Sequence, residues 1–122
     1  MTMIVNENAI KVMYPNNPSL VREIVDLFVV VVPEQMENLK QAIQEKDVKQ
    51  TAFYAHSLKG MFGNLALEPL QDLCLQLEKM GRNESIDGAE MLFGRVSDMV
   101  EEVMKELGTL SADCCAEPRG SG

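Results

Sequence analysis

Apolar residues recur at helical spacing through most of the chain, with polar faces between them. Steps of three and four residues place such side chains on one side of an α-helix. The pattern predicts helices over residues 19–32, 33–46, 48–66, 69–81 and 88–107. Long amphipathic helices with short connections fold back as antiparallel neighbours. The predicted fold is therefore all-α. The last four helices form an antiparallel up-and-down four-helix bundle, and the 19–32 helix is an additional N-terminal helix across one end or side.

The ambiguous segment of this pattern is residues 29–32, because four consecutive valines favour a strand locally. We expect a helix there, since no other segment of the sequence resembles a partner strand and tertiary packing can override a weak local propensity. Pro33 then either kinks the helix or occupies the first turn of a new one. Upstream, residues 6–15 (NENAIKVMYP) could form two helical turns before Pro15 ends them.

A chain of 122 residues is one domain by the usual size prior. We expect a lead-in over residues 1–17, the bundle over 18–108 and a flexible C-terminal tail over 109–122, where the sequence is small, polar and contains Pro and Gly. Gly81 stands where a left-handed residue would end the fourth predicted helix.

The formal net charge of −8 argues against nucleic acid and against an anionic membrane surface as partners. No apolar stretch approaches the roughly 20 residues that cross a bilayer. The three cysteines do not form the spaced pairs of a disulfide framework, which favours a reducing cytoplasm.

The single histidine of the chain, His56, lies in the predicted helix over residues 48–66. The apolar residues of that helix form one stripe: Thr51, Ala55, Leu58, Phe62 and Leu65. At about 100° per residue, the stripe is centred about 140° away from His56. Four other residues lie within about 60° of the histidine on the same count: Ala52, Lys59, Gly60 and Gly63. His56 is therefore predicted to face outward, beside one cation and three small residues.

Two readings of this face remain open: an ordinary solvated histidine with a surface lysine, or a displayed reactive group. The two glycines favour the second reading, since each costs a helix interior about 0.5–1 kcal/mol relative to Ala. An exposed imidazole, an adjacent cation and a cleared approach suit a phosphoryl acceptor. Metal binding is a weak rival, because there is one histidine and no CxxC. No acyl-transfer motif and no phosphate-binding GxxxxGK[ST] loop is present. We predict no metal and no cofactor.

The segment AHSLKG, flanked by LFVVVVPEQMENLKQAIQEKDVKQTAFY and LEPLQDLCLQLEKMG, resembles a histidine phosphotransfer (HPt) domain over residues 18–107. The resemblance implies that His56 accepts a phosphoryl group at Nε2, that Lys59 is the phosphate-facing cation and that Gly60 lets a receiver domain dock. It also implies that Glu78, twenty-two positions after the histidine, orients Nδ1. Rotation along its own helix places Glu78 about 100° from the core stripe, at the flank of the bundle surface.

The implied function is a phosphorelay carrier without kinase activity of its own. Its partners would be a response-regulator receiver domain and a hybrid or sensor histidine kinase, and the small residues Ala52, Gly60 and Gly63 would be the docking face. Two alternatives stay open: a helical adaptor that binds and inhibits a kinase or receiver without being phosphorylated, and an unrelated bundle with a chance motif. One position departs from the family, because Ala66 stands where a glycine usually turns the chain. The helix then runs slightly longer, or the chain turns at residues 68 and 69.

Overall fold

The computed structural model describes residues 4–115, and within them it contains five helices and no strand. The helices are α1 (Glu7–Met13), α2 (Pro18–Gln44), α3 (Val48–Gly63), α4 (Glu68–Arg82) and α5 (Ala89–Cys115). The predicted all-α fold is confirmed. No helix in this part of the chain is long and apolar enough to span a membrane.

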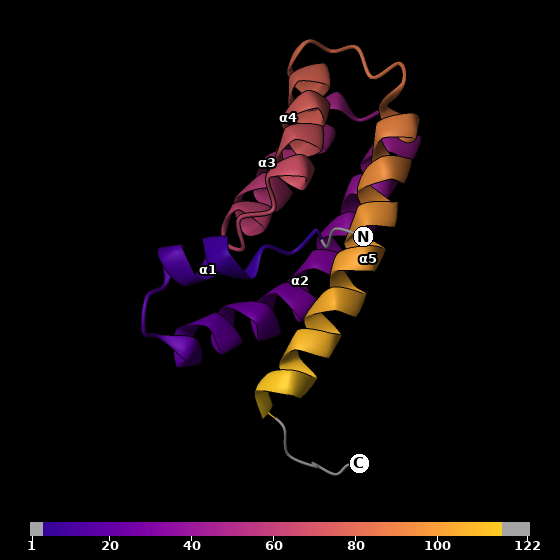
Figure 1. Ribbon diagram of the computed structural model, residues 1–122. Coiled ribbons are helices and arrows are strands. Elements are labelled where there is room, and N and C mark those ends of the chain that lie inside the picture. The colour runs from indigo at the N-terminus through magenta and orange to yellow at the C-terminus, as the bar shows by residue number, and fades with distance from the viewer. Residues whose placement is uncertain (1–3, 116–122) are drawn as a thin grey trace.

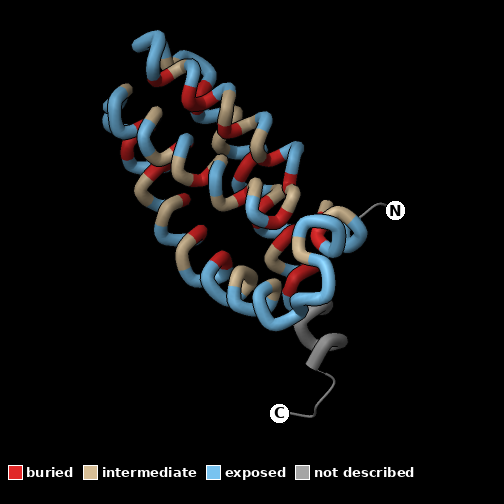
Figure 2. The backbone as a smooth tube through the Cα atoms, turned by 90° about the vertical axis from the view of Figure 1, so that its left-hand side faces the viewer, coloured by how far each residue is buried: buried red, intermediate tan, exposed pale blue. Residues whose placement is uncertain are grey.

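Helices α2 to α5 form a closed ring of neighbours. The helix α2 packs against α3 and α5, α4 packs against the same two helices, and the α3–α4 contact is the most extensive. The connections between them are short, so successive helices run antiparallel (Figure 1). Buried residues line the inside of the ring, and exposed residues lie on its outer side (Figure 2). In the core, the rings of Phe28 from α2 and Phe62 from α3 lie 5.9 Å apart between centroids.

The short helix α1 fills the part of the bundle that α3 and α4 leave uncovered. Helices α2 and α5 have 27 residues each, whereas α3 has 16 and α4 has 15. At 1.5 Å per residue, each long helix is about 17 Å longer than α3 or α4. Residues of the α1 region, Val5 and Ile10, join the core there. The Tyr14 hydroxyl donates to the carbonyl oxygen of Asn64 at 2.8 Å, and the buried Glu106 carboxylate accepts the backbone N–H of Val5 at 2.8 Å.

The separation of residues 19–32 and 33–46 into two helices was wrong. Both belong to α2, which continues through Pro33 and changes direction along its length (Figure 1). An internal proline removes one backbone hydrogen bond and bends a helix, but burial of Val32 and Met36 on its two sides holds the turns together. The additional N-terminal helix is therefore α1, not residues 19–32. The helical expectation for residues 29–32 is confirmed.

Three glycine and alanine positions at helix ends also differ from the prediction. Helix α3 ends at Gly63, and Ala66 itself adopts the left-handed conformation with φ of 56°, so neither predicted turn geometry is correct. Helix α4 continues through Gly81 to Arg82, so Gly81 is not a cap. Helix α5 passes Gly108 and reaches Cys115, because a single interior glycine costs a helix only about 1 kcal/mol. Residues 116–122 of the predicted tail lie outside the described part of the chain.

Gly81 instead permits the close approach of α3 and α4. A Cβ at this position would lie 2.7 Å from the carbonyl oxygen of Val48 and 2.8 Å from the backbone nitrogen of Ala52. Both are backbone atoms that no side-chain rotation can move away. The missing side chain therefore sets the spacing of the two helices that carry the predicted site.

Candidate functional site

Helix α3 displays His56 on the outer face of the bundle. The helix begins after Asp47, whose side chain accepts the backbone N–H of Gln50 at 3.1 Å and so caps it. The predicted apolar stripe is fully buried: Thr51, Ala55, Leu58, Phe62 and Leu65. The register of that stripe leaves His56 pointing outward, with 64% of its side chain exposed.

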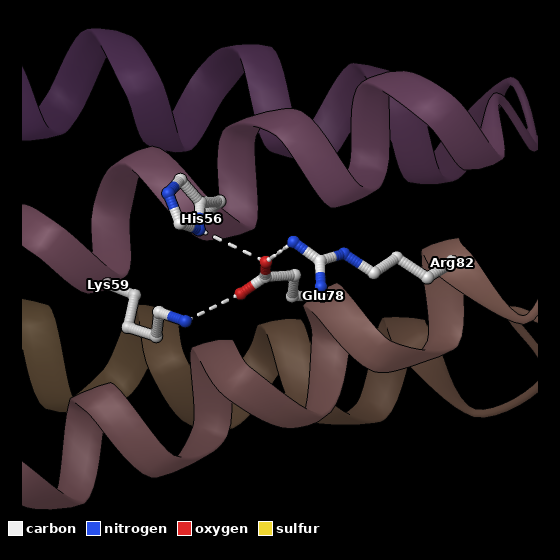
Figure 3. Close-up of polar contacts among 4 residues, drawn as sticks. All are labelled: His56, Lys59, Glu78 and Arg82. Atoms are coloured by element: carbon white, nitrogen blue, oxygen red, sulfur yellow. Dashed lines mark hydrogen bonds and ion pairs between the residues drawn. The ribbon is translucent and has the colours of Figure 1, made fainter.

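The carboxylate of Glu78, on α4, contacts three side chains at once (Figure 3). Its Oε2 lies 3.0 Å from Nδ1 of His56, and its Oε1 accepts a hydrogen bond from Nζ of Lys59 at 2.8 Å. Arg82, one turn further along α4, forms an ion pair with the same Oε2. The Glu78 side chain is only 2% exposed. A buried charge is tolerated when it is paired and hydrogen-bonded in this way.

The surroundings of Glu78 favour its ionised form. Burial alone raises the pKa of this carboxyl group, but the hydrogen bond and charge of Lys59, the charge of Arg82 and the hydrogen bond of His56 outweigh it. The net result is a pKa below the ordinary value of 4.5. An ionised carboxylate is an acceptor, so the contact with His56 requires the proton on Nδ1. Figure 3 shows the other ring nitrogen, Nε2, on the side of the ring away from Glu78. With the proton on Nδ1, Nε2 carries the free lone pair.

A buried thiol lies next to this cluster. Cys74 precedes Glu78 by one turn of α4 and is fully buried. Burial raises its pKa to about 12, the Glu78 charge adds to the effect and the Lys59 charge opposes it. The thiol therefore stays neutral. Since the thiolate is the reactive form of cysteine, Cys74 is not a reactive group of this site.

The structure brings together three of the residues selected from the sequence, His56, Lys59 and Glu78. The prediction that Glu78 flanks the bundle surface was wrong, since the close α3–α4 packing buries it. Arg82 was missed because the predicted helix stopped at Gly81. Had α4 been extended by one residue, the spacing of four between Glu78 and Arg82 would have indicated an ion pair.

The three small residues of the predicted docking face have different surroundings. A Cβ on Gly60 would meet no atom within 4 Å, so nothing inside the protein requires a glycine there. A Cβ on Gly63 would lie 2.7 Å from Nε2 of the Gln71 side chain, and Ala52 packs against Gly81. Internal packing thus accounts for the small size of Ala52. It does not require a glycine at Gly63, where a Cβ would meet only the far end of the flexible Gln71 side chain, or at Gly60. Within residues 4–115, no group of three or more His, Cys, Asp or Glu side chains is arranged to hold a metal ion.

The bundle exposes one histidine, and a buried carboxylate and two cations lie beside it. This arrangement is typical of small phosphotransfer modules. Residues 23–106 match the family model described as Hpt domain, so the chain belongs to the Hpt domain family.

Two relatives are similar to this chain. The phosphorelay intermediate protein rdeA of Dictyostelium discoideum is 26% identical over 85 residues, which cover 70% of this chain and 34% of that protein. The phosphotransferase RcsD of Escherichia coli K12 is 32% identical over 78 residues, which cover 64% of this chain and 9% of that protein. The chain thus spans about a third of one relative and about a tenth of the other. No solved structure matches the chain significantly.

Proposed function

We propose that this chain is a phosphorelay carrier. His56 accepts a phosphoryl group from a receiver aspartate or a sensor kinase and passes it to the aspartate of a response regulator. The observation that carries the proposal is the exposed imidazole whose Nδ1 is held by the buried Glu78 carboxylate. This contact selects the tautomer in which Nε2 can attack. Membership of the Hpt family and the names of the two relatives, a phosphorelay intermediate and a phosphotransferase, support the same function.

In the proposed transfer, the Nε2 lone pair forms a bond to phosphorus while the bond from phosphorus to the donor oxygen breaks. The charge that moves with the phosphoryl oxygens needs cations nearby. Lys59 and Arg82 are suited to this task, since both lie beside His56 on the Glu78 carboxylate. The proposal assigns the chain no kinase activity of its own, so a kinase or a phosphorylated receiver must supply the phosphoryl group.

The face around His56 also suits a receiver domain as partner. Gly60 leaves the approach to the imidazole open, and Phe53, three residues before the histidine, is 62% exposed. Exposed aromatic side chains are frequent anchors of protein interfaces. Helix α3 carries Lys49 and Lys59 and no acidic residue, although the whole chain has a net charge of −8. This local positive charge attracts an acidic partner surface. The partner would also present an aspartate as phosphoryl donor or acceptor.

The experiment that tests the chemistry incubates the chain with a radiolabelled, phosphorylated receiver domain and maps the labelled residue. The wild type should acquire an acid-labile, base-stable label on His56. His56→Gln should fold normally and remain unlabelled, because an outward side chain contributes little to the core. Lys59→Ala should be labelled more slowly, and Glu78→Ala should be affected less than Lys59→Ala. Undiminished labelling of His56→Gln would refute the assignment.

The same assay tests the docking role of Gly60 through Gly60→Gln, while labelling of the wild type itself separates the carrier from an inhibitory adaptor. This change should leave the fold intact or slightly stabilised, because it removes an exposed glycine from a helix interior. It should nevertheless slow phosphotransfer sharply, since the new side chain obstructs the approach to His56. The adaptor is not favoured, because a chain that only binds has no need of the histidine and its lysine. A phosphotransfer rate equal to that of the wild type would contradict the docking role of Gly60.

A further inference from the structure

We propose that helix α1 is exchanged between two copies of this chain. Residues 4–13, here called the strap, leave their own bundle and take the same place on a second copy, which returns its own strap. The product is a symmetric dimer, and the partner that this surface fits is a second copy of the chain. The proposal goes beyond the proposed function and does not depend on it, because it makes no use of His56.

The strap is held by few contacts. Within residues 4–115, all extensive helix–helix contacts lie among α2 to α5. Helix α1 has only seven residues, and helices shorter than about 12–15 residues are marginal without tertiary packing. Burial of Val5 and Ile10 fixes the strap, together with the Glu106 carboxylate, which accepts the backbone N–H of Val5 at 2.8 Å. Segments with few buried contacts open at a lower free energy than the core, so the strap can leave while α2 to α5 stay folded.

A second copy offers the strap the same surroundings. Once the strap has left, the Glu106 carboxylate loses its two backbone donors, Ile4 and Val5, and the apolar core is exposed where Val5 and Ile10 were packed. The strap of an identical chain restores each of these contacts. The closed monomer and the exchanged dimer therefore have the same strap contacts. They differ at the hinge, residues 14–17, and at the side chains beside it.

The hinge holds Asn16 in the left-handed conformation, with φ of 59°. Asparagine tolerates this conformation, but residues with a branched Cβ do not. Crossing to a second copy requires an extended hinge, and Pro15 favours extended backbone at the residue before it, Tyr14. An extended hinge no longer needs a left-handed residue. The residue type at position 16 thus sets the balance between the closed monomer and the exchanged dimer.

Exposed apolar side chains flank the hinge on both sides. Val12 and Met13 at the end of α1 are 80% and 44% exposed, and Leu20 in the first turn of α2 is 37% exposed. In a symmetric exchange the two hinges cross near the two-fold axis, which brings these side chains of both copies to one place. Burial of apolar surface there stabilises the dimer through a contact that the closed monomer lacks.

The experiment compares the wild type with Asn16→Val by analytical ultracentrifugation over a concentration series. A short connection keeps a segment at a millimolar effective concentration, so the wild type should form the dimer only near millimolar protein. A branched residue disfavours the left-handed hinge by about fivefold in each chain. A dimer has two hinges, so the dimer dissociation constant of Asn16→Val should fall by about 25-fold. The matched control is Glu84→Val, at a left-handed residue with φ of 58° between α4 and α5, which should keep the wild-type dissociation constant.

The exchange itself is detected in an Asn16→Val dimer made from equal amounts of ¹³C-labelled and unlabelled chains. NMR should then show NOEs between Val5 of one chain and Glu106 of the other, a contact that lies within one chain in the closed monomer. An unchanged dissociation constant, or Val5–Glu106 NOEs confined to single chains, would overturn the proposal. Equal dimerisation of Glu84→Val would do the same, because the hinge would then not be its cause. If Asn16→Val does not fold, the wild type at millimolar concentration, mixed in the same way, decides by the same NOEs.

Discussion

Replacing Gly81 by alanine should destabilise the bundle at the contact that also holds the site. The new Cβ would lie 2.7 Å from the oxygen of Val48, 2.8 Å from the nitrogen of Ala52 and 2.9 Å from its Cβ. An ordinary contact begins near 3.4 Å, so α3 and α4 would have to separate by about 0.7 Å. Overpacking of this kind costs about 1–3 kcal/mol. Alanine recovers about 0.5–1 kcal/mol of helix propensity. We therefore expect a net loss of about 1–2 kcal/mol.

The same separation should weaken the site. Ala52 and Gly81 each lie within about one turn of the residues that meet, His56 and Glu78. Moving the helices apart by about 0.7 Å would stretch the 3.0 Å contact between Nδ1 and Oε2 beyond hydrogen-bonding distance. Thermal unfolding followed by circular dichroism should show a melting temperature lower by roughly 3–10 °C. Phosphotransfer to His56 should also be slower in the folded variant.

The matched control is Gly94→Ala on α5, where a Cβ would meet no atom within 4 Å. This substitution in a helix interior should raise the unfolding free energy by about 0.5–1 kcal/mol, because alanine is the better helix former. A Gly81→Ala protein that is as stable as Gly94→Ala would refute the close-approach argument, since the backbone contacts would then have been absorbed without cost.

Three further predictions concern the turns and the buried carboxylate. Ala66→Gly should raise the free energy of unfolding in urea by about 0.5–1 kcal/mol, because it relieves a left-handed alanine; an unchanged value would contradict the strain. Tyr14→Phe should lower it by about 0.5–1.5 kcal/mol, through loss of the hydrogen bond to Asn64; equal stability would mean that this bond is not formed. Because the pKa of Glu78 is lowered in the folded protein, its stabilising effect is complete above pH 4.5 and is lost as the pH falls through the lowered value. Acid titration should therefore destabilise the wild type more than Glu78→Gln, and parallel titrations would contradict the lowered pKa.

The sequence by itself determined the orientation of the histidine. In a helix, each residue's direction relative to the apolar stripe follows from its position alone, so the burial of Leu58 and Phe62 requires His56 to face outward. The same periodicity predicted the all-α bundle. These features depend on local geometry and on which side chains avoid water, and both can be worked out from the order of residues.

Only the tertiary structure decided where the helices end and how closely they approach. Pro33, Gly81 and Gly108 are residues that usually interrupt helices, yet α2, α4 and α5 continue through them. At Pro33 the buried neighbours Val32 and Met36 hold the helix together. The sequence could not distinguish a glycine that caps a helix from one that admits a neighbouring backbone. That distinction determines the surroundings of Glu78. The close approach of α4 to α3 at Gly81 buries its carboxylate, and the continuation of α4 by one residue adds Arg82 to its partners. Both effects depend on the distance between two helices, and periodicity along one chain carries no information about that distance.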